Sequence, residues 1–195
     1  MSTDAETTRD YASQTGVIAT FTGQAVAPLN PDPETLFIED IAHALSNACR
    51  FVGHVDRFYS VAQHSVLCSD LVAKKAPDLA LTALMHDASE AYLSDIARPI
   101  KSQPEFGDVY KAVETGLEVV IANRFGLYYP YPEIIKWADN VLLRSEQRDL
   151  MPRTPEALKF THGEFLPFFI EPWLPAAAEV WFLETYARLS AEVHQ

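Results

Sequence analysis

The sequence predicts an all-α fold, a single helical bundle with a small β-hairpin near its N-terminus. Apolar residues recur at helical spacing from Ile38 onward. Serine, proline and glycine stand where such helices would begin and end. The 195 residues, 48% of them hydrophobic, suffice to bury one substantial core. We therefore expect one globular domain over residues 16–195, preceded by a flexible segment over residues 1–15.

The hairpin and the first helix follow from short local patterns. Two apolar runs, Val17 to Phe21 and Gln24 to Leu29, flank the dipeptide Thr22-Gly23 and predict two strands joined by a turn. A proline-rich turn at residues 28–33 separates this hairpin from the helical part of the chain. The first helix is predicted by apolar residues at positions i, i+3, i+4 and i+7, namely Ile38, Ile41, Ala42 and Leu45.

The next two helices are predicted from the residues that begin them, and the second is expected to be central. Residues 60–63 have the S-x-x-Q form of a capping box, so a helix should begin after Ser60 and run to about Lys75. Pro77 and Asp78 open the following helix, with Asp78 as the N-cap, and this helix should continue through His86 and Asp87. Residues 94–106 contain two prolines and no sustained periodicity, which predicts a loop.

Three further segments complete the bundle. An amphipathic helix is expected from Gly107 to Phe125, with Gly126 as its C-terminal cap, and another from Pro132 to about Leu150. Residues 152–175 are rich in proline and should be irregular, and residues 176–193 should form the last helix. The aromatic residues near this helix are interpreted either as core or as a subunit contact: Trp173, Trp181 and Phe182.

Composition narrows the classes of partner. The 15 Lys and Arg residues against 27 Asp and Glu residues give a net charge of -12, and no run of basic residues is present, so nucleic-acid binding is not expected. Local cations can still attract a small anion: Arg50, Arg57, Arg98 and Lys101. We expect no membrane span and no signal peptide in residues 1–14. Cys49 and Cys68 show no disulfide spacing, as is typical of a reducing cytoplasm.

The candidate site is a set of polar residues in apolar surroundings. His86 and Asp87 lie in the apolar run 79–88, and His64 and Asp139 lie on the apolar faces of two other predicted helices. Each alone is more often a core histidine or an ion-pair residue, but together they favour a metal site, because a buried charge must be paired, protonated or metal-bound. Two imidazoles and two carboxylates suit one divalent ion such as Co, Mn, Zn, Ni, Fe or Mg and leave coordination positions open.

These positions resemble the HD-domain phosphohydrolases, whose pattern is a His, then an adjacent His-Asp pair, then a late Asp. The likeness covers about residues 38–143 and is greatest to bacterial 5'-deoxynucleotidases and phage dATP triphosphohydrolases. Those enzymes share a string like residues 86–90, HDASE, followed by an Asp at 95 and Pro-Ile-Lys at 99–101. They also carry an Arg-aromatic pair like Arg50-Phe51 before the first ligand, and the hairpin and residues 40–46 are nearer to the phage type.

The resemblance implies an HD-domain bundle and an activity. It implies a cytoplasmic, divalent-metal-dependent phosphohydrolase that cleaves at the α-phosphate of a deoxynucleoside triphosphate, with dATP favoured, or of a deoxynucleoside monophosphate. A mononuclear site is expected, because no histidine occurs from residue 88 through 138. A homo-oligomer is expected from the relatives. Two alternatives stay open: a nucleotide-binding or sensor module without catalysis, and a phosphomonoesterase acting on another small ester.

The resemblance also assigns roles to individual residues. The metal ligands are His64, His86, Asp87 and Asp139. Glu90 and Asp95 carry the catalytic role, and Asp95 also contacts the sugar hydroxyl. The other substrate contacts are Arg50 and Lys101 to phosphate, Phe51 at the sugar 2' position, where the family often has tryptophan, and His54 in the loop near Arg50. His43 and His54 are the alternative ligands, although contact with phosphate or a structural role is favoured for both. Glu90 could instead be an ordinary ion-pair partner of Arg98 or Lys101.

Overall fold

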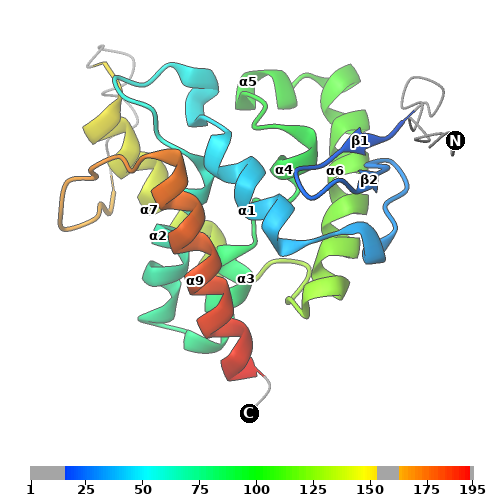
Figure 1. The fold of residues 1–195 in the computed structure, drawn as a ribbon. Coiled ribbons are helices and arrows are strands. Elements are labelled where there is room, and N and C mark those ends of the chain that lie inside the picture. The colour runs from blue at the N-terminus through cyan, green and yellow to red at the C-terminus, as the bar shows by residue number, and fades with distance from the viewer. Residues whose placement is uncertain (1–15, 153–162, 194–195) are drawn as a thin grey trace, which may run out of the picture.

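The computed structural model describes residues 16–152 and 163–193, and within these ranges the fold is all-α with one two-stranded hairpin, as predicted (Figure 1). The expected flexible segment 1–15 lies outside the described residues. The strands are β1 (Ile18–Ala19) and β2 (Ala25–Val26). The helices are α1 (Ile38–Asn47), α2 (Val61–Ala73), α3 (Ala80–Leu84), α4 (Glu90–Leu93), α5 (Arg98–Lys101), α6 (Pro104–Phe125), α7 (Glu133–Leu150) and α9 (Pro175–Val193). Short 3-10 turns are η1 (Pro33–Thr35), η2 (Arg50–Gly53) and η3 (Pro77–Leu79).

The hairpin is short and is tied to the first helix. β1 and β2 are antiparallel, with Ile18 opposite Val26. In the turn between them, the backbone N–H and the hydroxyl of Thr22 donate to the two carboxylate oxygens of Asp40, at 2.7 and 2.8 Å. Asp40 is 2% exposed, so these hydrogen bonds satisfy a buried carboxylate and fix the turn on α1.

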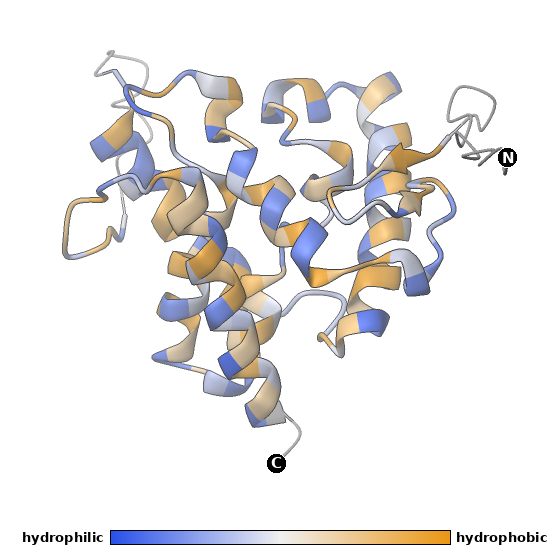
Figure 2. Ribbon diagram, viewed as in Figure 1, coloured by the Kyte–Doolittle hydropathy of each residue, from blue (hydrophilic) through white to orange (hydrophobic). Residues whose placement is uncertain are grey.

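Helix α2 is the centre of the bundle, because α1, α3, α7 and α9 all pack against it. In Figure 1, α6 and α7 lie toward opposite sides of the molecule with α1, α2 and α9 between them. Figure 2 shows hydrophobic and hydrophilic positions alternating along α6 and α9, as expected of helices with one buried face. One apolar cluster includes Ile41, Leu84, Leu117 and Phe182, and a second includes Val72, Leu142 and Leu166.

The predicted core role of the aromatic group near α9 is confirmed in part. Phe182 is fully buried in the first cluster, and Trp173 packs partly buried against it. Trp181 is 52% exposed and lies 6.1 Å from Trp173 between ring centroids. Only part of this group therefore belongs to the core.

The start of α2 has one of the two hydrogen bonds of the predicted capping box. The Ser60 hydroxyl accepts from the Gln63 backbone N–H at 3.1 Å, which satisfies a free donor of the first turn. The Gln63 side chain does not return to Ser60 as a capping box requires. It donates to the Glu171 carbonyl and accepts from the Trp173 N–H, both at 2.8 Å, and so supplies partners to two backbone groups of the irregular segment before α9.

The prediction of one helix that begins at Asp78 and continues through His86 and Asp87 is wrong at both ends. Asp78 is exposed within η3 and caps no helix, and α3 ends at Leu84. Residues 85–89 form turns instead, with a bond from the Glu90 N–H to the Asp87 carbonyl. The His86 side chain explains the break: its Nδ1 lies 2.8 Å from the Ala83 carbonyl, the acceptor that a continuing α-helix would give to the Asp87 N–H.

The loop predicted at residues 94–106 is partly helical. It contains α5, and α6 begins at Pro104, three residues before the predicted start. Proline is tolerated in the first turn of a helix, where its missing N–H has no partner to lose. The corner between α5 and α6 requires Gly107, because a Cβ there would lie 2.1 Å from the Lys101 carbonyl oxygen.

The remaining elements agree with the predictions made from the sequence. Gly126 caps α6 at φ +67°, in the left-handed region that glycine adopts freely. Helices α7 and α9 have the predicted extents to within a residue, and residues 163–174 contain no helix. Residues 153–162 of the predicted irregular segment lie outside the described residues. No helix in the described part of the chain combines the length and apolar character of a membrane span.

Candidate metal centre

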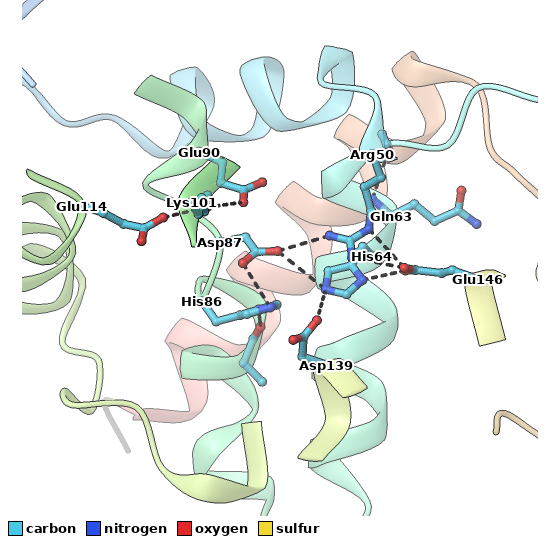
Figure 3. A network of polar contacts seen from close by, with 12 residues as sticks. Arg50, Gln63, His64, His86, Asp87, Glu90, Lys101, Glu114, Asp139 and Glu146 are labelled. Carbon is cyan, nitrogen blue, oxygen red and sulfur yellow. Dashed lines mark hydrogen bonds and ion pairs between the residues drawn. The ribbon is translucent and has the colours of Figure 1, made fainter. Parts of the chain in front are cut away.

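Four ligand-type side chains converge from three elements (Figure 3). His64 comes from α2, His86 and Asp87 from the turns after α3, and Asp139 from α7. His64 Nε2 lies 3.6 Å from Asp87 Oδ2 and 3.4 Å from Asp139 Oδ1. His86 Nε2 lies 3.3 Å from Asp87 Oδ1. Ligand atoms of His64, His86 and Asp87 all lie within 4.8 Å of one another, so these three residues could hold a metal ion.

The two histidines present the same nitrogen to the centre. The Ala83 carbonyl at 2.8 Å from His86 Nδ1 can only accept, so His86 Nδ1 carries the hydrogen. His64 Nδ1 lies 2.6 Å from the Glu146 carboxylate and donates to it. Both Nε2 atoms are buried and lack a hydrogen-bond partner within the described residues. A buried nitrogen without a partner is costly, and two of them beside two carboxylates fit the ligand set of a divalent metal ion.

The carboxylates around His64 favour its protonated form. Burial lowers the pKa of His64 most, and Arg50 lowers it further, but the Glu146 and Asp139 carboxylates outweigh both and raise it to about 9. Burial raises the pKa of Asp139, but His64, whose Nε2 lies 3.4 Å from Oδ1, and the nearby His86 and Arg50 hold that pKa well below its ordinary value. A cation at this place would replace the His64 proton as the partner of Asp87 and Asp139.

A buried carboxylate that the sequence did not reveal lies behind His64. Glu146 on α7 is 0% exposed, and its Oε2 accepts from Arg50 Nε at 3.2 Å and lies 3.1 Å from Arg50 Nη2. Arg50 is itself buried, with Nη1 3.5 Å from Asp87 Oδ2. The only sequence signal for Glu146 is its position seven residues after Asp139, two helical turns along the same face.

Glu90 and Lys101 form the other side of the site. Glu90 begins α4, is 9% exposed, and its Oε2 has no hydrogen-bond partner within the described residues. Burial raises the pKa of Glu90 well above its ordinary value, and the Asp87 and Asp95 carboxylates raise it further. Lys101 Nζ lies 3.7 Å from Glu90 Oε1 and donates to Glu114 Oε1 at 2.9 Å. Lys101 is therefore shared between two carboxylates, and Glu114 is a second residue that the sequence did not reveal.

The other predicted substrate contacts, Asp95, Phe51 and His54, are half-buried or exposed. Asp95 is half-buried between α4 and α5, close enough to Glu90 to affect its pKa. Phe51 is half-buried, with the Arg50 guanidinium carbon 5.5 Å from its ring centroid. Phe51 has φ +55°, in the left-handed region that non-glycine residues rarely adopt. His54 is exposed, and its backbone N–H donates to the Phe51 carbonyl. Their roles in binding substrate stay predictions.

His43 takes part in a different set of contacts. Its ring stacks on Phe21 at 3.8 Å between centroids, and its Nδ1 lies 3.1 Å from Glu179 Oε2 on α9. These contacts join the hairpin, α1 and α9. The group of side chains that could hold a metal ion does not include His43.

Comparison with known proteins places the chain among relatives of similar length. No family model matches it. A protein of Rhodobacter capsulatus, named only as uncharacterized, is 36% identical over 138 residues, which cover 66% of this chain and 69% of that protein. The uncharacterized protein YfdR of Escherichia coli K12 is 38% identical over 184 residues, which cover 89% of this chain and 95% of YfdR. With this identity over nearly the whole of both chains, the chain belongs to the same family as YfdR.

Proposed function

We propose that this protein is a divalent-metal-dependent deoxynucleotide phosphohydrolase. It would cleave at the α-phosphate of a deoxynucleoside triphosphate, with dATP favoured, or of a deoxynucleoside monophosphate, and release a deoxynucleoside. The observation that carries the proposal is the pair of buried histidines whose unpartnered Nε2 atoms face Asp87 and Asp139. His64, His86, Asp87 and Asp139 would hold one ion, with Co, Mn, Zn, Ni, Fe and Mg as the candidates. Such an ion neutralises phosphate charge and makes water more acidic.

Glu90 would accept the proton from the attacking water. A group that transfers protons near neutral pH works best when its pKa lies near that pH, and burial raises the pKa of Glu90 from its ordinary acidic value. Its Oε2 is buried and has no hydrogen-bond partner in the described part of the chain, so it is available to a water. Lys101, 3.7 Å from Oε1, would limit how far that pKa rises.

Two cations would hold the phosphate from opposite sides. In Figure 3, Arg50 and Lys101 lie on either side of Asp87. Arg50 Nη1 is 3.5 Å from Asp87 Oδ2, and Lys101 Nζ is 3.7 Å from Glu90 Oε1. Arginine can bind phosphate oxygens through its planar fork and lysine as a point charge. A site that binds only the α-phosphate and the sugar tolerates a longer phosphate tail, so both nucleotidase and triphosphohydrolase activities agree with it.

The test is product identification with defined metals. Purified protein is stripped with EDTA, supplied separately with Co, Mn or Mg, and incubated with each deoxynucleoside mono- and triphosphate. We expect deoxynucleoside plus phosphate or triphosphate, loss of turnover in Glu90→Gln, and full turnover in the exposed control Glu192→Gln. The proposal fails if no metal and nucleotide give product. Nucleotide-dependent stabilisation without product, unchanged in Glu90→Gln, would instead support a binding or sensor module. Inhibition of dAMP turnover by sugar phosphates would support a broader phosphomonoesterase.

A further inference from the structure

A single fully buried carboxylate, Glu146, contacts both a candidate metal ligand and a candidate phosphate-binding residue. We infer that Glu146 is a positioning residue: one of its oxygens fixes which nitrogen of His64 faces the metal, and the other holds Arg50 against Asp87. The inference rests on the proposed function. It goes beyond that function because it assigns the control of both groups to one side chain that contacts no substrate.

The geometry divides the carboxylate between its two partners (Figure 3). Oε1 accepts from His64 Nδ1 at 2.6 Å. Oε2 accepts from Arg50 Nε at 3.2 Å and lies 3.1 Å from Arg50 Nη2. Glu146 is 0% exposed, so water does not compete for either oxygen. One oxygen therefore contacts His64 and the other contacts Arg50, and the buried Tyr59 hydroxyl lies close enough to lower the pKa of Glu146 as well.

The first contact determines how His64 can bind an ion. A neutral imidazole carries one hydrogen, on Nδ1 or on Nε2, and only the other nitrogen can be a ligand. An acceptor at Nδ1 keeps a hydrogen there, so Nε2, which faces Asp87 and Asp139, is the nitrogen that can bind an ion in exchange for its own proton. His86 is held in the same state by the Ala83 backbone carbonyl, which no side-chain substitution removes. His86 therefore serves as an internal control for any change at Glu146.

The second contact determines where Arg50 points. With Nε and Nη2 directed at Glu146, the remaining terminal nitrogen, Nη1, lies 3.5 Å from Asp87 Oδ2. This is the end of the guanidinium that faces the centre. A glutamine in place of Glu146 has nearly the same size, but one end of its amide donates. Arg50 has only donors and keeps its hydrogens, so the amide oxygen of glutamine should face Arg50. Its NH2 group should then face His64, whose Nδ1 can accept only if the hydrogen of the neutral ring moves to Nε2, the nitrogen that faces the metal.

The inference is tested without nucleotide, on the full-length protein. The Nδ1 and Nε2 signals of ¹⁵N-labelled histidines are recorded with zinc bound and assigned by their loss in His64→Gln. Metal affinity is measured by competition with a chelator in wild type, Glu146→Gln, Glu146→Asp and the control Glu179→Gln. Glu179 is matched because it also pairs with a histidine, His43 at 3.1 Å, outside the centre.

We expect the wild-type His64 to carry its hydrogen on Nδ1 and to bind zinc through Nε2. Glu146→Gln should bind metal roughly 10–100-fold more weakly. Glu146→Asp should recover part of this loss, and the His86 signals and Glu179→Gln should match wild type. A wild-type His64 that binds zinc through Nδ1 would overturn the inference, and this result needs no variant to fold. Equal metal affinity in Glu146→Gln and Glu179→Gln would also overturn it. Absence of phosphohydrolase turnover would contradict the proposed function but leave both measurements unaffected.

Discussion

Replacing Arg50 with methionine should destabilise the metal-free protein severely. Arg50 is 9% exposed and gives Glu146 two contacts, at 3.2 and 3.1 Å, and Asp87 one at 3.5 Å. Methionine keeps much of the length of the side chain but carries no charge and donates no hydrogen bond. The substitution therefore leaves Glu146 ionised and fully buried, with His64 at 2.6 Å and the Tyr59 hydroxyl as its polar neighbours.

Removing one partner of a buried ion pair costs about 3–5 kcal/mol, because the other charge stays buried without compensation. Since His64 still contacts Glu146, we expect a loss near the lower end, about 3 kcal/mol. For a domain of this size, each kcal/mol lowers Tm by about 2–4 °C, so Tm should fall by roughly 10 °C. A loss of this size is a large part of a total stability of about 5–15 kcal/mol.

The loss should depend on pH in a defined direction. Burial raises the pKa of Glu146, but Arg50 and His64 outweigh it and hold that pKa below its ordinary value of 4.5. The stabilisation from Arg50 is therefore present above pH 4.5, where Glu146 is ionised in both folded and unfolded states, and disappears as the pH falls. Without Arg50, Glu146 can relieve its burial by binding a proton, so the difference between the two proteins should shrink on acidification.

The assay is urea and thermal unfolding followed by circular dichroism in EDTA. The matched control is Arg57→Met in the same loop, because Arg57 pairs with Glu171 at 3.0 Å but the two side chains are 58% and 77% exposed. An exposed pair of this kind contributes about 0–1 kcal/mol, so the control should stay close to wild type. If Arg50→Met and Arg57→Met lower stability equally, the buried network does not hold the site together and the reasoning is refuted.

Three further predictions follow from the site and the fold. Glu90→Gln should lower kcat by roughly 10²–10⁴-fold in steady-state assays while metal content stays unchanged, and a variant with wild-type kcat would exclude Glu90 as the base. In EDTA, unfolding free energy should fall as pH rises from 6.5 to 9, because the folded pKa of His64 is raised to about 9 and its stabilisation is lost on deprotonation; a flat urea-midpoint profile would contradict this. Ser60→Ala should cost about 1 kcal/mol in urea unfolding by removing the acceptor for the Gln63 N–H, and an unchanged midpoint would mean that the cap contributes nothing.

The sequence predicted the long helices well because their signals are local. Helices α1, α7 and α9 have clear starts or periodic apolar faces, and Gly126 ends α6 as expected. The break after α3 was not predictable in this way. It depends on whether His86 Nδ1 or the Asp87 N–H uses the Ala83 carbonyl, a competition between side chain and backbone that residue spacing does not reveal.

The same limit applies to the site. His64, His86, Asp87 and Asp139 stood out because polar residues in apolar runs need an explanation. Glu146 did not, because it lies among Arg144, Gln147 and Arg148 and reads as part of a solvated helix face. Its burial follows from its partners: Arg50 is 96 residues away in the chain and His64 is 82 residues away. Only the folded structure brings these charges together.

The proposed hydrolysis at phosphorus is tested most directly by the fate of the oxygen of water. Metal-loaded protein is incubated with dATP and, separately, dAMP in H₂¹⁸O, and the products are analysed by mass spectrometry. The account predicts deoxyadenosine without label and one ¹⁸O atom in the released triphosphate or phosphate. Label in the deoxyadenosine, or the absence of product from both nucleotides in protein shown to contain one metal ion per chain, would contradict it.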